Sequence, residues 1–173
     1  MEENKTEFVK LTENDIPDCV QIYFSAFKIL EQIRPFYNAA RYFGKYISDD
    51  DKFAYGLKCD DKLVGIMVAI QLPAFFSDYT IYIDVVAIQP EYQHRGLGTK
   101  MMNSFFESVS GKSATSLNTY KNSEPYKFYQ QFRFKDDEIV HMEREYIDVN
   151  ELIKRLENEV ANLREKNSTQ PIE

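Results

Sequence analysis

The chain has 173 residues, of which 43% are hydrophobic and 28% are charged, a composition typical of a folded protein rather than a disordered one. Lysine and arginine number 21 against 28 aspartates and glutamates, so the net charge is -7 and no overall basic surface favours nucleic acid or an anionic membrane. A cationic small molecule or a basic peptide fits this charge better. No run of about 18 apolar residues and no leader-like N-terminus occur, so we expect a cytoplasmic protein with one main domain.

Cysteine and histidine are too sparse and too scattered to predict a metal site. Cys19 and Cys59 lie far apart and in no paired spacing, so we interpret both as buried or inert thiols. The two histidines, His94 and His141, belong to no ligand spacing either. We therefore expect no metal, and we expect His141 to be a surface or packing residue.

The first third of the chain predicts a strand followed by two aromatic helices. Phe8, Val9 and Leu11 predict a short strand, and Thr12 with Asp15 has the spacing of a helix cap. Helical periodicity then extends to about residue 30, and Pro35 separates it from a second helix that reaches residue 47. The aromatic faces of these helices are typical of core packing, and the alternative is that some rings line an acceptor pocket.

A hairpin and a central strand follow. Residues 53–58 and 63–72 read as the two strands of the hairpin, joined by an acidic turn. The linker at 73–78 carries Phe75 and Phe76, which form either a local hydrophobic plug or part of a substrate or partner surface. Residues 81–88 are rich in β-branched side chains and predict the central strand, which stops at Pro90.

The segment after the central strand predicts a phosphate-binding loop. Apolar residues recur at helical spacing from Thr99 onward, which places a helix start at Gly96 to Thr99. Free main-chain N–H groups and the helix dipole attract anions at such a start, and glycines let a ligand approach the backbone closely. We therefore expect this loop to hold a pyrophosphate.

The C-terminal third predicts a strand at 114–119, a short helix with Ser123 as its expected cap, a last strand at 139–147, and a separate helix at 148–166. Apolar residues in that last helix are spaced 4, 3, 4 and 3, as in a heptad seam. It either packs on its own domain or pairs two copies in a homodimer. The expected divisions are a domain at 1–147, an amphipathic helix at 148–167 and a frayed tail at 168–173.

Two ordered segments resemble the GNAT superfamily of acetyl-CoA-dependent N-acetyltransferases. The first is the strand ending at Ile88 followed by Gln93-x-x-Gly96-x-Gly98, which is similar to that family's acetyl-CoA-binding segment. The second is Asn122-x-x-Pro125-x-x-Phe128-Tyr129-x-x-Phe132-Arg133-Phe134, which is similar to its Asn, Ala, Phe-Tyr and Gly-Phe pattern. The resemblance covers about residues 7–146 and leaves the C-terminal helix outside.

The resemblance implies an α/β fold with a mixed, largely antiparallel sheet of about 6–7 strands, splayed at the centre and flanked by helices on both faces. It also implies acetyl-CoA as co-substrate, with the pantetheine arm in the splay against the main chain of Val86 and Ile88. Asn122 would fix its loop or contact the coenzyme, with a helix cap as the alternative. The residues expected around the pyrophosphate are Gln93, His94, Arg95, Gly96, Leu97, Gly98 and Thr99.

The chain departs from the family pattern at two positions. Arg133 stands where the family has a glycine, so a residue with a Cβ must take that turn, in a left-handed conformation that costs about 1 kcal/mol. Pro125 replaces a small residue, which the first turn of a helix tolerates. Neither change lies in the phosphate loop.

Three residues are candidates for the chemistry of acetyl transfer to an amine. Tyr129 matches the family's tyrosine and, as a phenol with an ordinary pKa of about 10, can protonate the coenzyme sulfur at neutral pH. Asp84 is a carboxylate in a strand that otherwise reads as core, which makes it either the base for the amine proton or a salt-bridge partner. Tyr82 could orient a water, and strand alternation predicts that it shares a face with Asp84, Val86 and Ile88.

The sequence therefore predicts an N-acetyltransferase that moves the acetyl group directly to a primary amine of a small molecule or peptide. No cysteine lies in either matched segment, which disfavours an acyl-cysteine intermediate. The alternative is a non-catalytic acyl-CoA-binding or assembly module that uses the C-terminal helix and Phe75-Phe76 as contact surfaces.

Overall fold

The computed structural model describes residues 5–29, 35–73, 79–109 and 114–136. The chain divides into two units, Met1–Phe134 and Lys135–Glu173, and the second lies almost wholly outside the described residues. The predicted last strand, the C-terminal helix with its boundary at 147, and Phe75-Phe76 also lie outside them and stay predictions. In the part of the chain that is described, no helix is both long and apolar enough to cross a membrane.

The helices and strands of the first unit lie close to the predicted positions. The elements in chain order are β1 (Thr6–Lys10), η1 (Glu13–Asp15), α1 (Ile16–Phe27), α2 (Phe36–Ile47), β2 (Lys52–Cys59), β3 (Lys62–Pro73), β4 (Tyr79–Ile88), η2 (Pro90–Tyr92), α3 (Leu97–Ser108), β5 (Ala114–Leu117) and α4 (Glu124–Gln130). The predicted cap before α1 is confirmed, because the Asp15 carboxylate accepts hydrogen bonds from the Thr12 main-chain N–H and hydroxyl at 2.8 and 2.7 Å.

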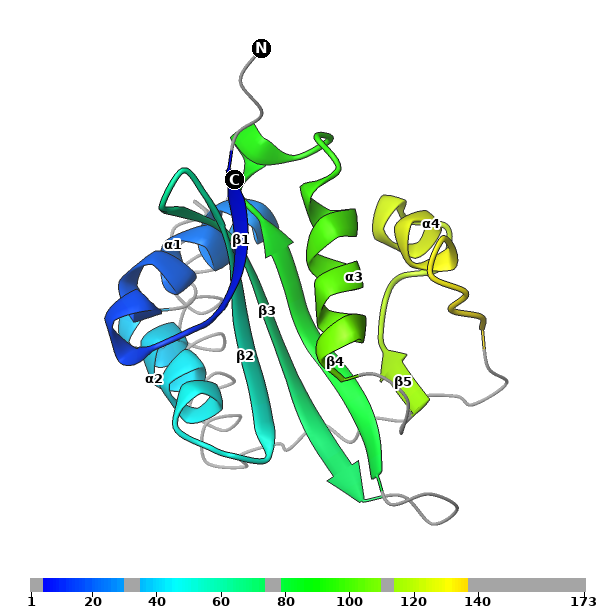
Figure 1. The fold of residues 1–173 in the computed structure, drawn as a ribbon, viewed down its shortest axis with the longest axis horizontal. Helices are drawn as coiled ribbons and strands as arrows, with labels where there is room; N and C mark the ends of the chain where they lie inside the picture. The colour runs from blue at the N-terminus through cyan, green and yellow to red at the C-terminus, as the bar shows by residue number, and fades with distance from the viewer. Residues whose placement is uncertain (1–4, 30–34, 74–78, 110–113, 137–173) are drawn as a thin grey trace, which may run out of the picture. The chain divides into compact units, whose positions relative to one another are not determined.

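The strands form one sheet in the order β1-β2-β3-β4-β5. The first four are antiparallel neighbours, and β5 lies parallel to β4. Helices α1 and α2 cover one face of the sheet, and α3 and α4 lie on the other (Figure 1). The expected mixed, largely antiparallel sheet with helices on both faces is confirmed. The described residues supply five strands where 6–7 were expected, and the next predicted strand, 139–147, lies beyond them.

Two apolar cores lie on the two faces of the sheet and leave no charged side chain buried among the described residues. The core under α1 and α2 includes Val20, Phe43, Ile66, Val68, Val85 and Ala87. The core under α3 includes Met67, Ile81, Ile83, Ile88, Met101 and Phe105. Strand β4 thus contributes residues to both cores, which is possible for a strand in the middle of a covered sheet.

Candidate active site

A β-bulge at Asp84 divides β4 into two halves. Val85 pairs with Val68 of β3, and Ile83 pairs with the next residue of β3, Ala69, so Asp84 has no partner across the ladder. An extra residue of this kind shifts the alternation of side chains by one position. Residues on either side of Asp84 that are an even number apart therefore point to opposite faces.

The bulge makes one sequence prediction wrong. Strand alternation placed Tyr82, Asp84, Val86 and Ile88 on one face, but Val86 and Ile88 pack into the core under α3. Asp84 instead lies against α2 on the other face. The sequence does contain a signal of the shift, because the alternation of apolar and polar residues stops at Asp84 and Val85 and Val86 follow as adjacent apolar residues.

Asp84 is held by two tyrosines of α2. The hydroxyls of Tyr42 and Tyr46 donate hydrogen bonds to Asp84 Oδ2 at 2.5 and 2.6 Å. The two tyrosines are four residues apart, so they project from one side of the helix. Among the described residues, none donates a hydrogen bond to the other carboxylate oxygen, Oδ1, and the Asp84 side chain is exposed. The carboxylate is thus oriented by its neighbours and still open to a ligand.

Burial keeps both tyrosines protonated as donors. Burial first, and then the hydrogen bond to Asp84, raises the pKa of Tyr42 and of Tyr46 well above the ordinary phenol value. The pKa of Tyr82 is raised by burial and, secondarily, by the negative charge of Asp84, which places the Tyr82 phenol near that carboxylate. Sequence reasoning did not single out Tyr42 and Tyr46. The available signal was the four-residue spacing of the two tyrosines on an aromatic helix, because buried phenol hydroxyls need polar partners.

The second half of β4 has an open edge on the side of β5. Pairing between the two parallel strands ends at Ile83 and Leu117, so residues 84–88 have no described strand partner on that edge. The Gln89 N–H donates to the Val64 carbonyl of β3 at 2.8 Å, and alternate residues of a strand direct their main-chain groups to opposite edges. Val86 and Ile88 therefore direct theirs to the open edge, as the predicted splay requires.

The loop after β4 is fixed by a side chain and by two left-handed residues. Gln93 Nε2 donates to the Ile88 carbonyl at 2.9 Å and ties the loop to the end of the strand. His94 and Gly96 have φ values of 59° and 77°. A Cβ on Gly96 would meet no atom within 4 Å, so the backbone conformation, and not space, is what requires glycine there.

The helix start predicted after this loop is confirmed, since α3 begins at Leu97 with Gly96 as its N-cap. The first intrahelical acceptor is the Gly96 carbonyl, which takes the Lys100 N–H at 3.0 Å. The N–H groups of Leu97, Gly98 and Thr99 therefore have no acceptor within the helix. Together with the helix dipole they form a ready site for phosphate oxygens.

Gly98 also has a packing role that the sequence did not predict. A Cβ on this residue would lie 3.4 Å from the Phe128 ring, at van der Waals contact, so Gly98 lies directly against α4. His94 adds a surface contact between the loop and α4, with Nδ1 3.8 Å from the Glu124 carboxylate and both side chains more than three-quarters exposed. A pair this exposed contributes little stability. His94 itself lies in the loop between β4 and α3, as predicted.

The turn before α4 has the predicted cap and an unpredicted conformation. Ser123 Oγ accepts the Tyr126 N–H at 3.2 Å and is the N-cap, so that role does not fall to Asn122. Asn122 is exposed with φ 64°, a left-handed value that asparagine tolerates well. At the other end of the helix, Arg133 has φ 67°, which confirms the left-handed turn expected where the family has glycine.

Tyr129 lies on α4 among aromatic side chains on the α3 side of the sheet. Its ring centroid lies 5.2 Å from that of Phe128 and 5.8 Å from that of Phe134. Burial raises its pKa to about 12, so the phenol keeps its proton at neutral pH. Asp84 and Tyr129 therefore place a carboxylate and a phenol on opposite sides of β4.

The comparisons with known proteins agree with this geometry. Residues 16–134 match the model of the acetyltransferase (GNAT) family, so the chain belongs to that family. None of the curated proteins matches the chain in sequence.

Solved structures of acetyltransferases share the fold at low identity. An aminoglycoside acetyltransferase from an uncultured soil metagenomic sample, in complex with sisomicin, is 17% identical with a TM-score of 0.68 over 82% of this chain and 97% of its own. A possible acetyltransferase from Clostridium difficile 630 is 14% identical with a TM-score of 0.71 over 84% and 99%. A predicted acetyltransferase from Clostridium acetobutylicum with acetyl-CoA is 17% identical with a TM-score of 0.66 over 80% and 96%.

Proposed function

We propose that the protein transfers the acetyl group of acetyl-CoA directly to a primary amine of a small molecule or peptide. The observation that carries the proposal is the Asp84 carboxylate, held by Tyr42 and Tyr46 at a bulge that coincides with the start of the open edge of β4. A carboxylate oriented in this way and open on one oxygen can accept a proton from an ammonium group.

The coenzyme would be bound mainly by main-chain groups. The N–H groups of Leu97, Gly98 and Thr99 would take its pyrophosphate, with Gln93 and the glycine conformation at Gly96 holding the loop in shape. The main chain of Val86 would pair with the pantetheine arm as an added strand does. The Ile88 carbonyl already accepts from Gln93, so Ile88 would contribute through its N–H.

The reaction then needs two proton transfers on the two sides of the thioester. An ammonium group gives one proton to Asp84, and the resulting amine attacks the thioester carbonyl, forming the C–N bond as the C–S bond breaks. Tyr129 donates its proton to the departing thiolate and is reprotonated by the second proton that the new amide nitrogen loses, and Asp84 then releases its proton to solvent. The phenol pKa of about 12 keeps Tyr129 in the donor form for this step.

Direct transfer is favoured over an acyl-enzyme because the cysteines are buried. Cys19 is fully buried, and burial raises the pKa of its thiol to about 12, far from the thiolate that a nucleophile needs. Cys59 is also buried, at the end of β2. The acceptor that fits best is a cationic amine, because the chain has a net charge of -7 and Asp84 is exposed between tyrosines.

The test combines binding and turnover. Titration calorimetry with acetyl-CoA should show binding, and a panel of polyamines, aminoglycosides and peptides with free N-termini should identify an amine that releases free coenzyme thiol. A folded protein that gives no binding heat would contradict the proposal. Binding without thiol release for any class of amine would favour a non-catalytic acyl-CoA-binding module instead.

A further inference from the structure

A row of aromatic side chains leads away from Asp84 along the two helices that cover this face of the sheet. Helices α1 and α2 lie side by side there (Figure 1). The centroid of the Tyr42 ring, whose hydroxyl donates to Asp84, lies 6.5 Å from that of Tyr23, and the Tyr23 centroid lies 5.0 Å from that of Phe27. We call Tyr42, Tyr23 and Phe27 the aromatic row. It joins the carboxylate to the C-terminal end of α1.

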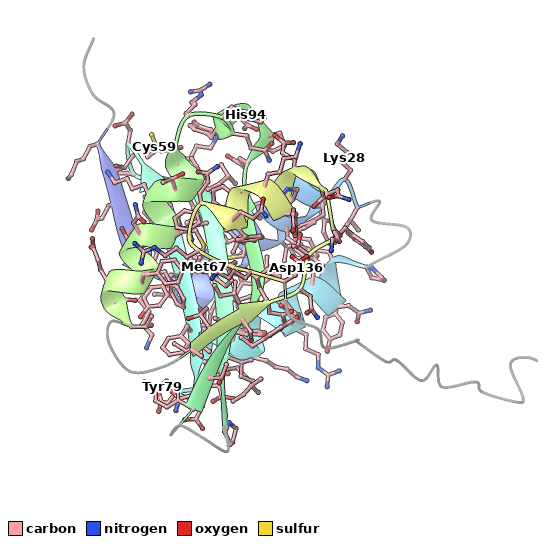
Figure 2. All side chains as sticks on the ribbon, turned by 90° about the vertical axis from the view of Figure 1, so that its right-hand side faces the viewer. Lys28, Cys59, Met67, Tyr79, His94 and Asp136 are labelled. Carbon is pink, nitrogen blue, oxygen red and sulfur yellow. The ribbon has the colours of Figure 1, made fainter. Side chains whose placement is uncertain are left out.

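The outer end of the aromatic row is more exposed than core packing requires. Phe27 is 51% exposed, and its one ring contact among the described residues is with Tyr23. Tyr23 and Tyr42 are half-buried against the core under α1 and α2, whereas Phe27 belongs to neither core. Lys28, the next residue, lies at the margin of the molecule (Figure 2). Core packing thus accounts for the two tyrosines and leaves the Phe27 ring available to a ligand.

The charges around the aromatic row favour a ligand with a single ammonium group. Within the described helices α1 and α2, the one carboxylate is Asp18, in the first turn of α1 and so at the opposite end from Phe27. The charged side chains of α2 are both cations, Arg41 and Lys45. An amine bound at Asp84 would therefore have aromatic carbon beside the rest of its body. A polyamine would find no second carboxylate on these helices beside the outer rings, so its other ammonium groups would lose water without gaining a partner.

We propose that the acceptor is an arylalkylamine, with its ammonium group at Asp84 and its aromatic ring against Tyr23 and Phe27. This inference rests on the proposed function, because it names the acceptor class of the same site. Aromatic rings pack at centroid distances of about 4.5–7 Å, the range found within the row, so a ring of the ligand can extend it. An alkyl chain must separate amine from ring, since Asp84 contacts the Tyr42 hydroxyl and the exposed ring is two ring contacts further along.

The experiment compares three primary amines that share one alkyl chain and differ at its far end. Butylamine ends in a methyl group, 4-phenylbutylamine in an aromatic ring, and 1,4-diaminobutane in a second ammonium group. Release of coenzyme thiol from acetyl-CoA gives kcat/KM for each amine. The unmodified protein should use 4-phenylbutylamine about thirtyfold better than butylamine, because the ring is buried against the aromatic row. It should use 1,4-diaminobutane no better than butylamine.

Phe27→Ala should lower the preference for the ring to about threefold, through a higher KM for 4-phenylbutylamine. Turnover of butylamine should be unchanged, which also shows that the variant is folded. Tyr37→Ala removes a ring of α2 that is 70% exposed and lies outside the aromatic row, so this matched control should keep the full preference. Phe27→Glu adds a carboxylate at the outer end of the row and should raise kcat/KM for 1,4-diaminobutane by about fivefold.

The outcomes separate this inference from the proposed function. Equal use of butylamine and 4-phenylbutylamine by the unmodified protein would overturn the inference and leave the transferase proposal intact. A preference for 1,4-diaminobutane, or a preference for the ring that Phe27→Ala does not reduce, would do the same. Thiol release with an aminoglycoside or a peptide but with none of these three amines would also overturn the inference alone. Absence of thiol release with every class of amine would instead contradict the proposed function.

Discussion

The two faces of β4 contribute different kinds of chemical groups to the proposed reaction. On the α2 face, the site consists of side chains, a carboxylate with two hydroxyl donors. On the α3 face, the proposed coenzyme binding depends on main-chain N–H groups, a left-handed glycine and a glycine packed against a ring. Substitutions that remove functional groups should therefore act on the first face, and substitutions that change backbone conformation should act on the second.

The largest effect should come from Asp84→Asn. The amide oxygen can still accept from Tyr42 and Tyr46, but the residue can no longer take a proton, so kcat/KM should fall by about 10²–10⁴. The affinity for acetyl-CoA by calorimetry should stay within about twofold. A variant with near-normal turnover would contradict the role of Asp84 as base and favour a structural carboxylate.

Tyr129→Phe should come next. Removing the phenol keeps the aromatic contacts with Phe128 and Phe134 but removes the donor for the thiolate, so kcat should fall by about 10² with an unchanged Kd for acetyl-CoA. Steady-state turnover and calorimetry separate the two quantities. Equal losses in both would assign the ring to binding. Because the phenol pKa is about 12, Tyr129 should cause no decline in kcat between pH 7 and 9.

Gly96→Val tests the face that depends on main-chain conformation. A β-branched residue at φ 77° is strained, so the loop should rearrange and the Kd for acetyl-CoA should rise by about tenfold or more, for a strain of about 1–3 kcal/mol. With saturating coenzyme, kcat should change much less. The matched control is Gly44→Ala in α2, where a Cβ meets only the end of Ile16 at 3.8 Å. An unaltered Kd in the Gly96→Val variant would contradict the phosphate site.

Tyr42→Phe and Tyr46→Phe should have smaller, separable effects. Each removes one hydrogen bond to Asp84 Oδ2, worth about 1 kcal/mol, so each should lower kcat/KM by about fivefold. The double variant should lose more than the product of the two, because the carboxylate then has no orienting donor. Tyr37→Phe, on the exposed side of the same helix, is the control and should have no effect.

Much of this arrangement could be predicted because its causes are local. The turn residues, the caps at Thr12 and Ser123 and the helix start after Gly96 depend on residues that are neighbours in the chain. The left-handed turn at Arg133 follows from the family's glycine at that position in the same way. Those features were confirmed by the structure.

The parts that were missed depend on contacts between distant segments. The pair of Tyr42 and Tyr46 with Asp84 joins residues about forty positions apart, and Gly98 meets Phe128 from another helix. The bulge depends on how β3 and β4 pair, which strand periodicity alone does not show. Lys5 and Lys100 line one cavity although they lie far apart in the chain, and no local pattern in the sequence indicates it.

The bulge at Asp84 affects how this chain should be aligned with related proteins. If a relative has an ordinary strand there, an ungapped alignment matches residues that point to opposite faces on one side of position 84. The exposed carboxylate at position 84 would then be compared with a buried side chain, and identity would be counted between residues in different environments. A one-residue gap at position 84 restores the correspondence, which makes this single residue the reference point for transferring site assignments to or from this protein.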